Sequence, residues 1–286
     1  MQILDGKAYS TELRSEIKIN AQNFFNKYNR QIGLAVVIVG DDPASHVYVK
    51  NKILATEQCY FKSFSVKLDD TVTQEEIEEK VKSLAQNDEV DGIIVQLPLP
   101  KKYNSAKILS HIPAEKDVDG LCSENLGKLV KGEKSLISCT PYGIIKILKR
   151  YGVELSGKNA VVIGRSNMVG KPVASLLMQE NCTVTVCHSK TADIKSFTKN
   201  ADILVAAIGK ANFVTNDMVK DGAVVVDVGI NRVEGKLVGD VDYQSVKDKC
   251  SFITPVPGGV GPMTVTMLMY NTMVSAYRSK GVYDFE

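Results

Sequence analysis

Two residues near the start of the chain, Tyr48 and Lys52, have side chains suited to catalysis. They lie four residues apart, a spacing that places both side chains on one face of a helix. An apolar run at 34–39 precedes them, and the loop 41–44 has the composition of a strand end followed by a helix start. We therefore expect the phenol and the amine near the carboxyl end of a buried strand, where open α/β sheets bind ligands. The alternative is a solvated lysine beside a half-buried tyrosine.

A second candidate site is the glycine turn that begins at Gly164. The segment 161–172 is typical of a strand, a turn and a helix start, which is where a dinucleotide pyrophosphate binds to backbone N–H groups. The spacing from Gly164 to Gly170 is G-x5-G and differs from the G-x-G-x-x-G fingerprint, so a purely structural turn is the alternative. The turn opens a β-α-β unit, and that context favours nucleotide binding.

The end of the next strand distinguishes between the two nicotinamide cofactors. NAD enzymes usually carry an acid there, which holds a ribose hydroxyl. This chain has no acid in 186–190, and it offers Arg165, Ser189 and Lys190 instead. These residues predict a site for a ribose phosphate and hence for NADP; the alternative is a solvated basic turn.

Three further features are weaker when taken alone. Gln96 ends an apolar strand, although a glutamine there is usually incidental. Asp119 precedes Gly120, and an aspartate in that position is usually a turn former. The segment 255–262 is either a stiff linker or a loop whose glycines permit close approach of a ligand.

The predicted elements place these residues on two α/β series. The first has a helix over about 8–28, strands at 34–39, 60–66 and 91–100, and a helix opened by the capping box Thr73–Glu76. This β-α-β-α-β order predicts a parallel sheet with right-handed crossovers. Residues 113–140 are predicted to be a connection that lines a cleft, and a helix at 140–151 follows.

The second series begins at residue 159. Its predicted elements are strands at 160–163, 183–187, 203–206, 223–228 and 251–254, a helix at 170–179, a hairpin within 231–240 and a last helix at 263–277. The two series predict two domains, which the length of 286 residues can supply with separate cores.

Composition excludes several classes of protein. Hydrophobic residues make up 44% and charged residues 24%, and the net charge is +2, so no general attraction to nucleic acid or membrane is expected. The six cysteines form no C-x-x-C pair and the three histidines are dispersed, which predicts no metal site and a reduced, cytoplasmic protein. We expect no signal peptide and no membrane span, because no apolar run reaches ~18 residues.

The motifs, taken in order, resemble one family. They are S-x-x-Y-V-x-x-K at 45–52, V-Q-L-P-L-P at 95–100, K-D-V-D-G at 116–120, C-T-P at 139–141, G-R-S-x-x-V-G-x-P at 164–172, H-S-K-T at 188–191 and P-V-P-G-G-V-G-P-M-T at 255–264. Together they closely resemble bifunctional methylenetetrahydrofolate dehydrogenase/methenyltetrahydrofolate cyclohydrolase over nearly the whole chain.

The resemblance implies roles for individual residues. Lys52 is the catalytic lysine, with Tyr48 stacked on the folate, Gln96 hydrogen-bonded to Lys52 and Asp119 gripping the pterin. The folate site also includes Leu97, Pro98, Pro257, Gly258 and Gly259. The NADP site includes Gly164, Arg165, Ser166, Ser189 and the backbone of Ile230. The family is a homodimer that pairs through its nucleotide-binding domains.

We therefore expect an α/β protein of two domains flanking a cleft: a folate-binding domain, 1–140 plus 262–286, and a Rossmann-type NADP-binding domain, 141–261. The expected reaction oxidises 5,10-methylenetetrahydrofolate and hydrolyses the methenyl product to 10-formyltetrahydrofolate, in one-carbon metabolism that supplies purine synthesis. Another two-domain dehydrogenase, such as the shikimate type, and a nucleotide-sensing protein without activity are the alternatives.

Overall fold

The computed structural model describes residues 1–41 and 43–283, without the side chains of residues 43–49. The chain forms two compact units. The three-stranded unit consists of Glu12–Lys128, Lys134–Cys139 and Val265–Glu286. The six-stranded unit consists of Met1–Thr11, Leu129–Glu133 and Thr140–Thr264. Residues 1–11 and 129–133 thus belong to the six-stranded unit, and the domain boundaries expected from the sequence stay a prediction.

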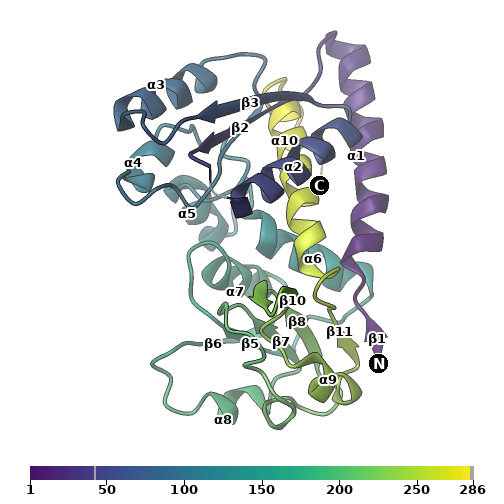
Figure 1. Ribbon diagram of the computed structural model, residues 1–286. Coiled ribbons are helices and arrows are strands. Elements are labelled where there is room, and N and C mark those ends of the chain that lie inside the picture. Colours follow the sequence, from purple (N-terminus) through teal and green to yellow (C-terminus); the bar gives the residue numbers. More distant parts are fainter. Residues whose placement is uncertain (42, 284–286) are drawn as a thin grey trace. The chain divides into compact units, whose positions relative to one another are not determined.

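The three-stranded unit is built on a parallel sheet in the order β3-β2-β4 (Figure 1). Its strands are β2 (Gly33–Val39), β3 (Lys62–Leu68) and β4 (Gly92–Val95). Every residue of β2 is buried, as expected for a central parallel strand covered on both faces. The predicted β-α-β-α-β order is confirmed, with α2 (Pro43–Gln58) and α3 (Gln74–Ala85) as the two crossover helices.

Helix α3 begins at the predicted capping box. The Thr73 hydroxyl accepts a hydrogen bond from the Glu76 backbone N–H, and the Glu76 carboxylate accepts one from the Thr73 N–H at 2.7 Å. One stripe of α3, formed by Ile77, Val81 and Leu84, packs on the same face of the sheet as α4 (Ser105–Leu109) (Figure 1). Burial of that stripe fixes the helix against the sheet, since capping alone contributes only about 1 kcal/mol.

The segment 113–140 is not an irregular connection throughout, as the sequence predicted; it contains α5 (Ser123–Lys131). The apolar residues of this helix, Leu126, Leu129 and Val130, do fall at helical spacing, but the helix has only nine residues, and it exposes Val130 while it buries the polar Asn125. Gly127 in its middle weakens the helical signal further. The pattern of the sequence therefore predicted a loop where the structure has a short helix.

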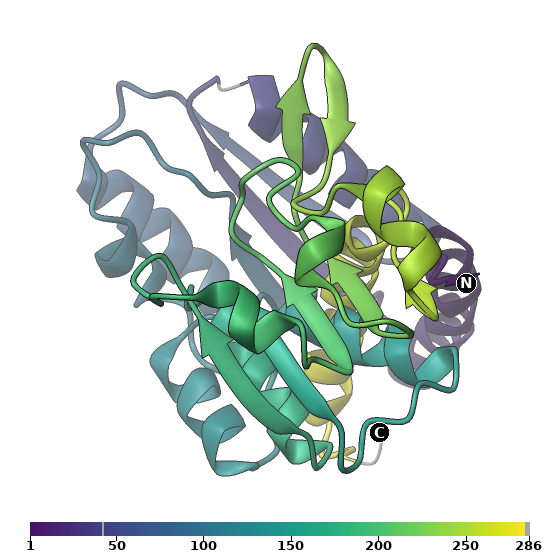
Figure 2. The same ribbon diagram turned by 90° about the horizontal axis from the view of Figure 1, so that it is seen from below.

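The six-stranded unit carries one parallel sheet in the order β1-β11-β8-β7-β5-β6. The predicted strands are present as β5 (Asn159–Ile163), β6 (Thr183–Cys187), β7 (Ile203–Ala206), β8 (Val224–Asp227) and β11 (Phe252–Ile253). The predicted helix is α7 (Gly170–Gln179), and the predicted hairpin is β9 (Asn231–Val233) with β10 (Lys236–Val238), which projects from the sheet (Figure 2).

The sheet also contains a strand that the sequence did not reveal. β1 (Gln2–Ile3) pairs in parallel with β11, and a run of two residues is too short to give a periodic signal. The remaining helices of this unit are α8 (Ile194–Thr198), α9 (Tyr243–Val246) and the 3₁₀ turns Asn216–Met218 and Lys247–Lys249.

Three longer helices contain residues of both units. They are α1 (Gly6–Tyr28), α6 (Cys139–Arg150) and α10 (Val260–Arg278). All three were predicted, with starts within three residues of those observed. Within the part of the chain that the structure describes, no helix is both long enough and apolar enough to cross a membrane.

Candidate active site

The first candidate site lies at the carboxyl end of the three-stranded sheet. The crossover from β2 leads to β3 on one side, and the crossover from β3 returns to β4 on the other side of β2, so the direction of strand addition reverses here. Ligands of open α/β sheets bind at such a point. Helix α2, which carries Lys52, follows β2, and Gln96 follows β4 with its N–H donating to Val37 O at 2.8 Å.

The two polar side chains meet at this point. Lys52 Nζ donates a hydrogen bond to Gln96 Oε1 at 2.8 Å, and Gln96 Nε2 donates to Leu97 O at 2.6 Å. The second bond fixes the amide orientation, because it leaves only the amide oxygen to face the lysine. Both Lys52 and Gln96 are half-buried, so the amine is shielded from bulk water and still reachable.

Asp119 is close enough to Lys52 for a direct electrostatic interaction. Desolvation lowers the pKa of Lys52, and the Asp119 carboxylate opposes that fall. Burial also raises the pKa of the Asp119 carboxyl, and the Lys52 ammonium opposes that rise. The charge on each group thus opposes the pKa shift of the other, while desolvation, the larger cause, shifts both toward the neutral forms.

A cysteine that the sequence reasoning left without a role borders the same site. Cys139 is buried, and its Sγ donates to Val118 O at 3.2 Å and interacts with the Asp119 carboxyl. Burial raises the pKa of the Cys139 thiol well above its usual value, so this residue stays a neutral donor. The C-T-P motif at 139–141 was the only signal for it.

A cavity of about 540 Å³ opens beside these residues within the three-stranded unit. Asp119 and Leu97 line it together with residues of β4, α4 and the start of α5. A cavity of this size and mixed lining suits a small organic ligand. Pro98 is exposed and follows Leu97 through a cis peptide bond. The side chain of Tyr48 lies outside the described residues, although its backbone belongs to α2.

The second candidate site lies at the corresponding point of the six-stranded sheet, where β5 separates β6 from β7. Gly164 follows β5 with φ +128°, and a Cβ at this position would lie 2.2 Å from Ala207 O. A Cβ on Gly170 would lie 2.3 Å from Gly164 O. Both positions therefore require glycine, since the backbone passes too closely for any side chain.

The turn after β5 leads into the amino end of α7. Ser166 Oγ accepts hydrogen bonds from the N–H groups of Val169 at 3.1 Å and Gly170 at 3.3 Å, at the start of α7. Arg165 and Ser166 are exposed. The amino end of a helix after a tight strand-to-helix turn is a common place for a phosphate, because N–H groups and the helix dipole point toward it. The residues at this turn thus fit a dinucleotide pyrophosphate.

The register of the sheet relates Arg165 to Ser189. Ile163, the last residue of β5, pairs in parallel with Cys187, the last residue of β6. Arg165 lies two positions after Ile163, and Ser189 lies two positions after Cys187. The turn that carries Ser189 is held by His188 N–H donating to Thr191 Oγ1 at 2.9 Å and by Thr191 N–H donating to His188 O at 2.8 Å. Arg165 and Ser189 are exposed at adjacent strand ends, where a ribose phosphate could bind both.

A third group of predicted residues lines a smaller cavity in the six-stranded unit. Ile230 and the loop residues Pro257, Gly258 and Gly259 border a space of about 110 Å³. Pro257 and Ile230 are exposed, while Gly259 is buried. The structure thus brings Ile230, which was predicted to bind NADP, next to three residues that were predicted to bind folate. The sequence alone did not indicate this proximity.

Two buried carboxylates hold the segment that precedes Ile230. Asp227 accepts hydrogen bonds from the N–H groups of Gly229, Asp240 and Val241 at 2.8–3.0 Å. Asp240 accepts from Ile208, Gly209 and Lys210 N–H at 2.7–2.9 Å and from Asn231 Nδ2 at 3.0 Å. Sequence reasoning missed this pair; the nearby glycines, Gly229 and Gly239, were the only hint, because a Cβ on either would collide with a carboxylate.

Comparison with known proteins matches both parts of the chain to one family. Residues 4–119 match the catalytic domain of tetrahydrofolate dehydrogenase/cyclohydrolase, and residues 138–280 match its NAD(P)-binding domain. The bifunctional protein FolD of Campylobacter hominis is 54% identical over 277 residues, which cover 96% of this chain and 97% of the relative. The chain belongs to the tetrahydrofolate dehydrogenase/cyclohydrolase family.

Solved structures agree with this assignment. The bifunctional FolD enzyme of Campylobacter jejuni is 48% identical with a TM-score of 0.96, covering 98% of this chain and 99% of that one. The Trypanosoma brucei dehydrogenase-cyclohydrolase, solved with NADP cofactor and an inhibitor, is 39% identical with a TM-score of 0.92 and covers 96% and 97%. The family's catalytic domain contains Lys52, Gln96 and Asp119, and its NAD(P)-binding domain contains the Gly164 turn.

Proposed function

We propose that this protein oxidises 5,10-methylenetetrahydrofolate with NADP and hydrolyses the 5,10-methenyl product to 10-formyltetrahydrofolate, as a step of one-carbon metabolism. The observation that carries the proposal is the Lys52 amine, which is desolvated and held at 2.8 Å by a neutral amide in a chain of this family. The proposed catalytic group is Lys52, Gln96, Asp119 and Tyr48. Leu97, Pro98 and 257–259 complete the folate site.

The first reaction needs little acid–base chemistry. The hydride leaves a carbon bonded to two nitrogens, and the product is a delocalised cation, so no proton has to be removed. NADP, when bound, accepts that hydride. The protein's own contribution is orientation of the folate, which can lower a barrier by several kcal/mol. Asp119 suits this task, because a carboxylate in the 540 Å³ cavity can accept hydrogen bonds from the N–H edge of a pterin.

The second reaction requires a base. A water molecule must attack the methenyl carbon and lose a proton, and a positioned base contributes about 10²–10⁴-fold. A protonated lysine would repel the cationic carbon, so the neutral amine is the useful form. Desolvation lowers the pKa of Lys52 toward that form, and Gln96 orients the amine without adding a negative charge that would raise the pKa again.

The NADP site is proposed at the Gly164 turn. The backbone and Ser166 at the start of α7 hold the pyrophosphate, while Arg165 and Ser189 hold the ribose phosphate. The backbone of Ile230 contacts the nicotinamide half. Support for this arrangement comes from the two obligatory glycines, the exposed cation at a strand end and the absence of an acid in 186–190.

We also propose a homodimer formed through the six-stranded unit, in a cytoplasmic setting. The edge strand β6 supports the dimer: among the described residues no strand pairs with its outer side, Val186 is 39% exposed, and Phe197 of α8 is 43% exposed. An uncovered edge strand with apolar neighbours is a common pairing surface. Sedimentation of the wild type beside Val186→Lys would test this: the charge should shift the dimer toward monomer.

The deciding experiment follows both reactions with purified protein. Methylenetetrahydrofolate and NADP should yield NADPH, and methenyltetrahydrofolate alone should be hydrolysed. An enzyme of the shikimate type would reduce or oxidise its own substrate and leave methylenetetrahydrofolate untouched. A nucleotide-sensing protein would bind NADP without producing NADPH. Either result would refute the proposal.

A further inference from the structure

Helix α10 carries two buried polar residues one turn apart, Asn271 and Ser275, which are 2% and 6% exposed. Residues four apart lie on one face of a helix. A buried amide or hydroxyl in an apolar helix is costly unless its hydrogen bonds are made. Both residues make theirs to backbone carbonyls: Asn271 to Val118 O and Ile137 O, and Ser275 to Asp91 O and Glu115 O.

Asn271 joins two of these segments at the candidate site. Its Nδ2 donates to Val118 O and to Ile137 O, both at 2.8 Å, and lies 3.7 Å from Cys139 Sγ. Val118 directly precedes Asp119, and Ile137 precedes Cys139 by two residues. One planar amide thus fixes the backbone beside both side chains that interact with Lys52.

The two segments that Asn271 joins, 118–120 and 137–139, pack closely against each other. Gly120 has φ +68°, and a Cβ there would lie 2.5 Å from Ile137 C and Ser138 N. Ser138 Oγ donates to Gly120 O at 2.8 Å. The backbone around Asp119 therefore has its position set by contacts with 137–139, and Asn271 donates from α10 to a carbonyl of each segment.

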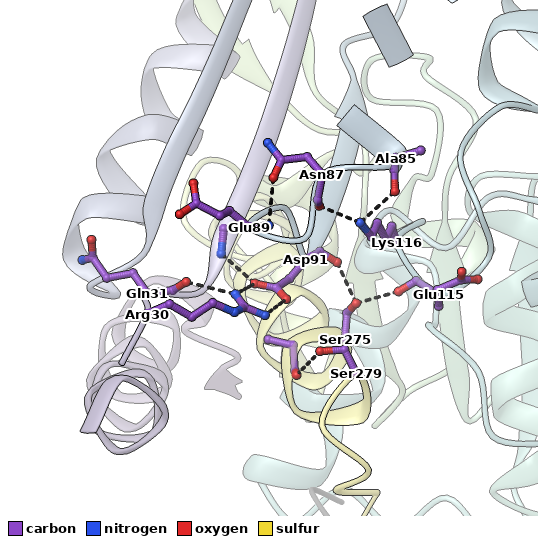
Figure 3. Close-up of polar contacts among 12 residues, drawn as sticks. Arg30, Gln31, Ala85, Asn87, Glu89, Asp91, Glu115, Lys116, Ser275 and Ser279 are labelled. Carbon is purple, nitrogen blue, oxygen red and sulfur yellow. Dashed lines mark hydrogen bonds and ion pairs between the residues drawn. The ribbon is translucent and has the colours of Figure 1, made fainter. Parts of the chain in front are cut away.

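Ser275 makes the same kind of bond at the other end of the connection. Its hydroxyl lies 2.6 Å from both Asp91 O and Glu115 O, as Figure 3 shows. There the chain is held by further bonds, between Arg30 and the Asp91 carboxylate at 2.8 Å and between Lys116 Nζ and two carbonyls (Figure 3). This end lies at the amino end of β4, whereas Gln96 follows its carboxyl end.

We infer that Asn271 is a positioning residue of the folate site, which acts by holding the Asp119 carboxyl in place against Lys52 and the substrate; this inference rests on the proposed function. Without the two donors, Ile137 O loses the bond from Asn271, and Val118 O keeps only the weaker thiol donor of Cys139 at 3.2 Å, so the backbone at both points is held less firmly. Asp119 moves with them, because it is bonded directly to Val118. Ser275 holds the backbone at Asp91 and Glu115 and so stabilises the fold, but it does not position the Asp119 carboxyl.

The experiment compares Asn271→Leu with Ser275→Ala. Leucine has nearly the shape of asparagine and donates no hydrogen bond. Asn271→Leu should raise the KM for methylenetetrahydrofolate about tenfold, the effect of roughly one to two lost hydrogen bonds, while the Kd for NADP stays within about twofold. Ser275→Ala should lower the Tm and leave both constants unchanged. If Asn271→Leu fails to fold, Asn271→Ala leaves room for a water and replaces it in the comparison.

The possible outcomes are distinct. A folded Asn271 variant with wild-type KM overturns the inference. An equal rise in KM for Ser275→Ala at a similar loss of Tm also overturns it, because general loosening then explains the effect. If the wild-type protein itself does not convert methylenetetrahydrofolate, the proposed function fails first, and the inference fails with it.

Discussion

Replacement of Lys52 by methionine separates the two proposed reactions. Methionine keeps an unbranched apolar side chain and removes the amine that donates to Gln96 Oε1 at 2.8 Å. Because Gln96 is half-buried, water can replace the lost donor, and the variant should remain folded. The cyclohydrolase activity should fall by about two orders of magnitude or more, whereas dehydrogenase activity should survive in measurable part.

The pH dependence of the cyclohydrolase activity follows from the ionisation of the Lys52 amine. A lysine with an ordinary pKa of about 10.4 is neutral in only about 0.1% of molecules near pH 7.4, and each unit by which the pKa falls raises that fraction about tenfold. Burial of Lys52 lowers the pKa in this direction. The hydrolysis rate of the wild type should therefore rise with pH up to the pKa of Lys52, and this rise should be absent in Lys52→Met.

Two optical assays test the prediction. NADPH formation reports the dehydrogenase, and loss of methenyltetrahydrofolate reports the cyclohydrolase; in Lys52→Met the methenyl compound should accumulate during turnover. If the variant hydrolyses methenyltetrahydrofolate at the wild-type rate, Lys52 is not the base. If both activities vanish in a folded variant that still binds folate, the proposed division of labour is wrong.

Three further predictions concern the carboxylates and the NADP turn. Arg165→Ala should reduce kcat/KM with NADP about tenfold or more and change that with NAD little, because it removes a charged phosphate contact; equal wild-type values for the two cofactors would contradict this reasoning. Asp119→Ala should weaken folate binding in both reactions and leave the Kd for NADP near wild type; normal folate affinity would show that Asp119 only shapes its turn. Burial raises the pKa of Asp227 to about 6. A raised carboxyl pKa stabilises the fold below the unfolded value of about 3.9, and this stabilisation is lost as pH rises through about 6. The free energy of unfolding of the wild type relative to Asp227→Asn should thus be greater at pH 5 than at pH 7.5, by about 1.4 kcal/mol. Denaturant titrations of both proteins at the two pH values measure it, and a constant difference would show that Asp227 does not titrate there.

The strands that build both sites were predictable from sequence because they are continuous apolar runs. Every residue of β2 and β4, and every residue of β5 after Asn159, is buried, so nearly the whole length of each strand carries the signal. The start of α3 was equally clear, because Thr73 and Glu76 fix it through local hydrogen bonds. Local patterns of this kind need no knowledge of the rest of the fold.

The features that sequence patterns did not predict depend on contacts between distant segments. β1 exists only because β11 offers it a pairing edge, and α5 buries the polar Asn125, whose side chain donates to Ala114 O and to Asp117 Oδ2. The Lys52–Gln96 bond joins residues 44 positions apart. Family resemblance, and not residue patterning, pointed to that pair, and neither approach indicated Asn271.

The choice of partner for Lys52 explains how one pocket can serve both reactions. A carboxylate in the place of Gln96 would form a close ion pair and keep the amine protonated, which would suit substrate binding and prevent base catalysis. An apolar residue would leave the amine free to rotate. The amide gives orientation without charge, while Asp119 supplies a negative charge whose own pKa is raised by burial. Because desolvation lowers the pKa of Lys52, the neutral amine becomes more accessible as the group that receives the proton from the attacking water, and the Asp119 carboxylate can balance the charge of the cationic intermediate.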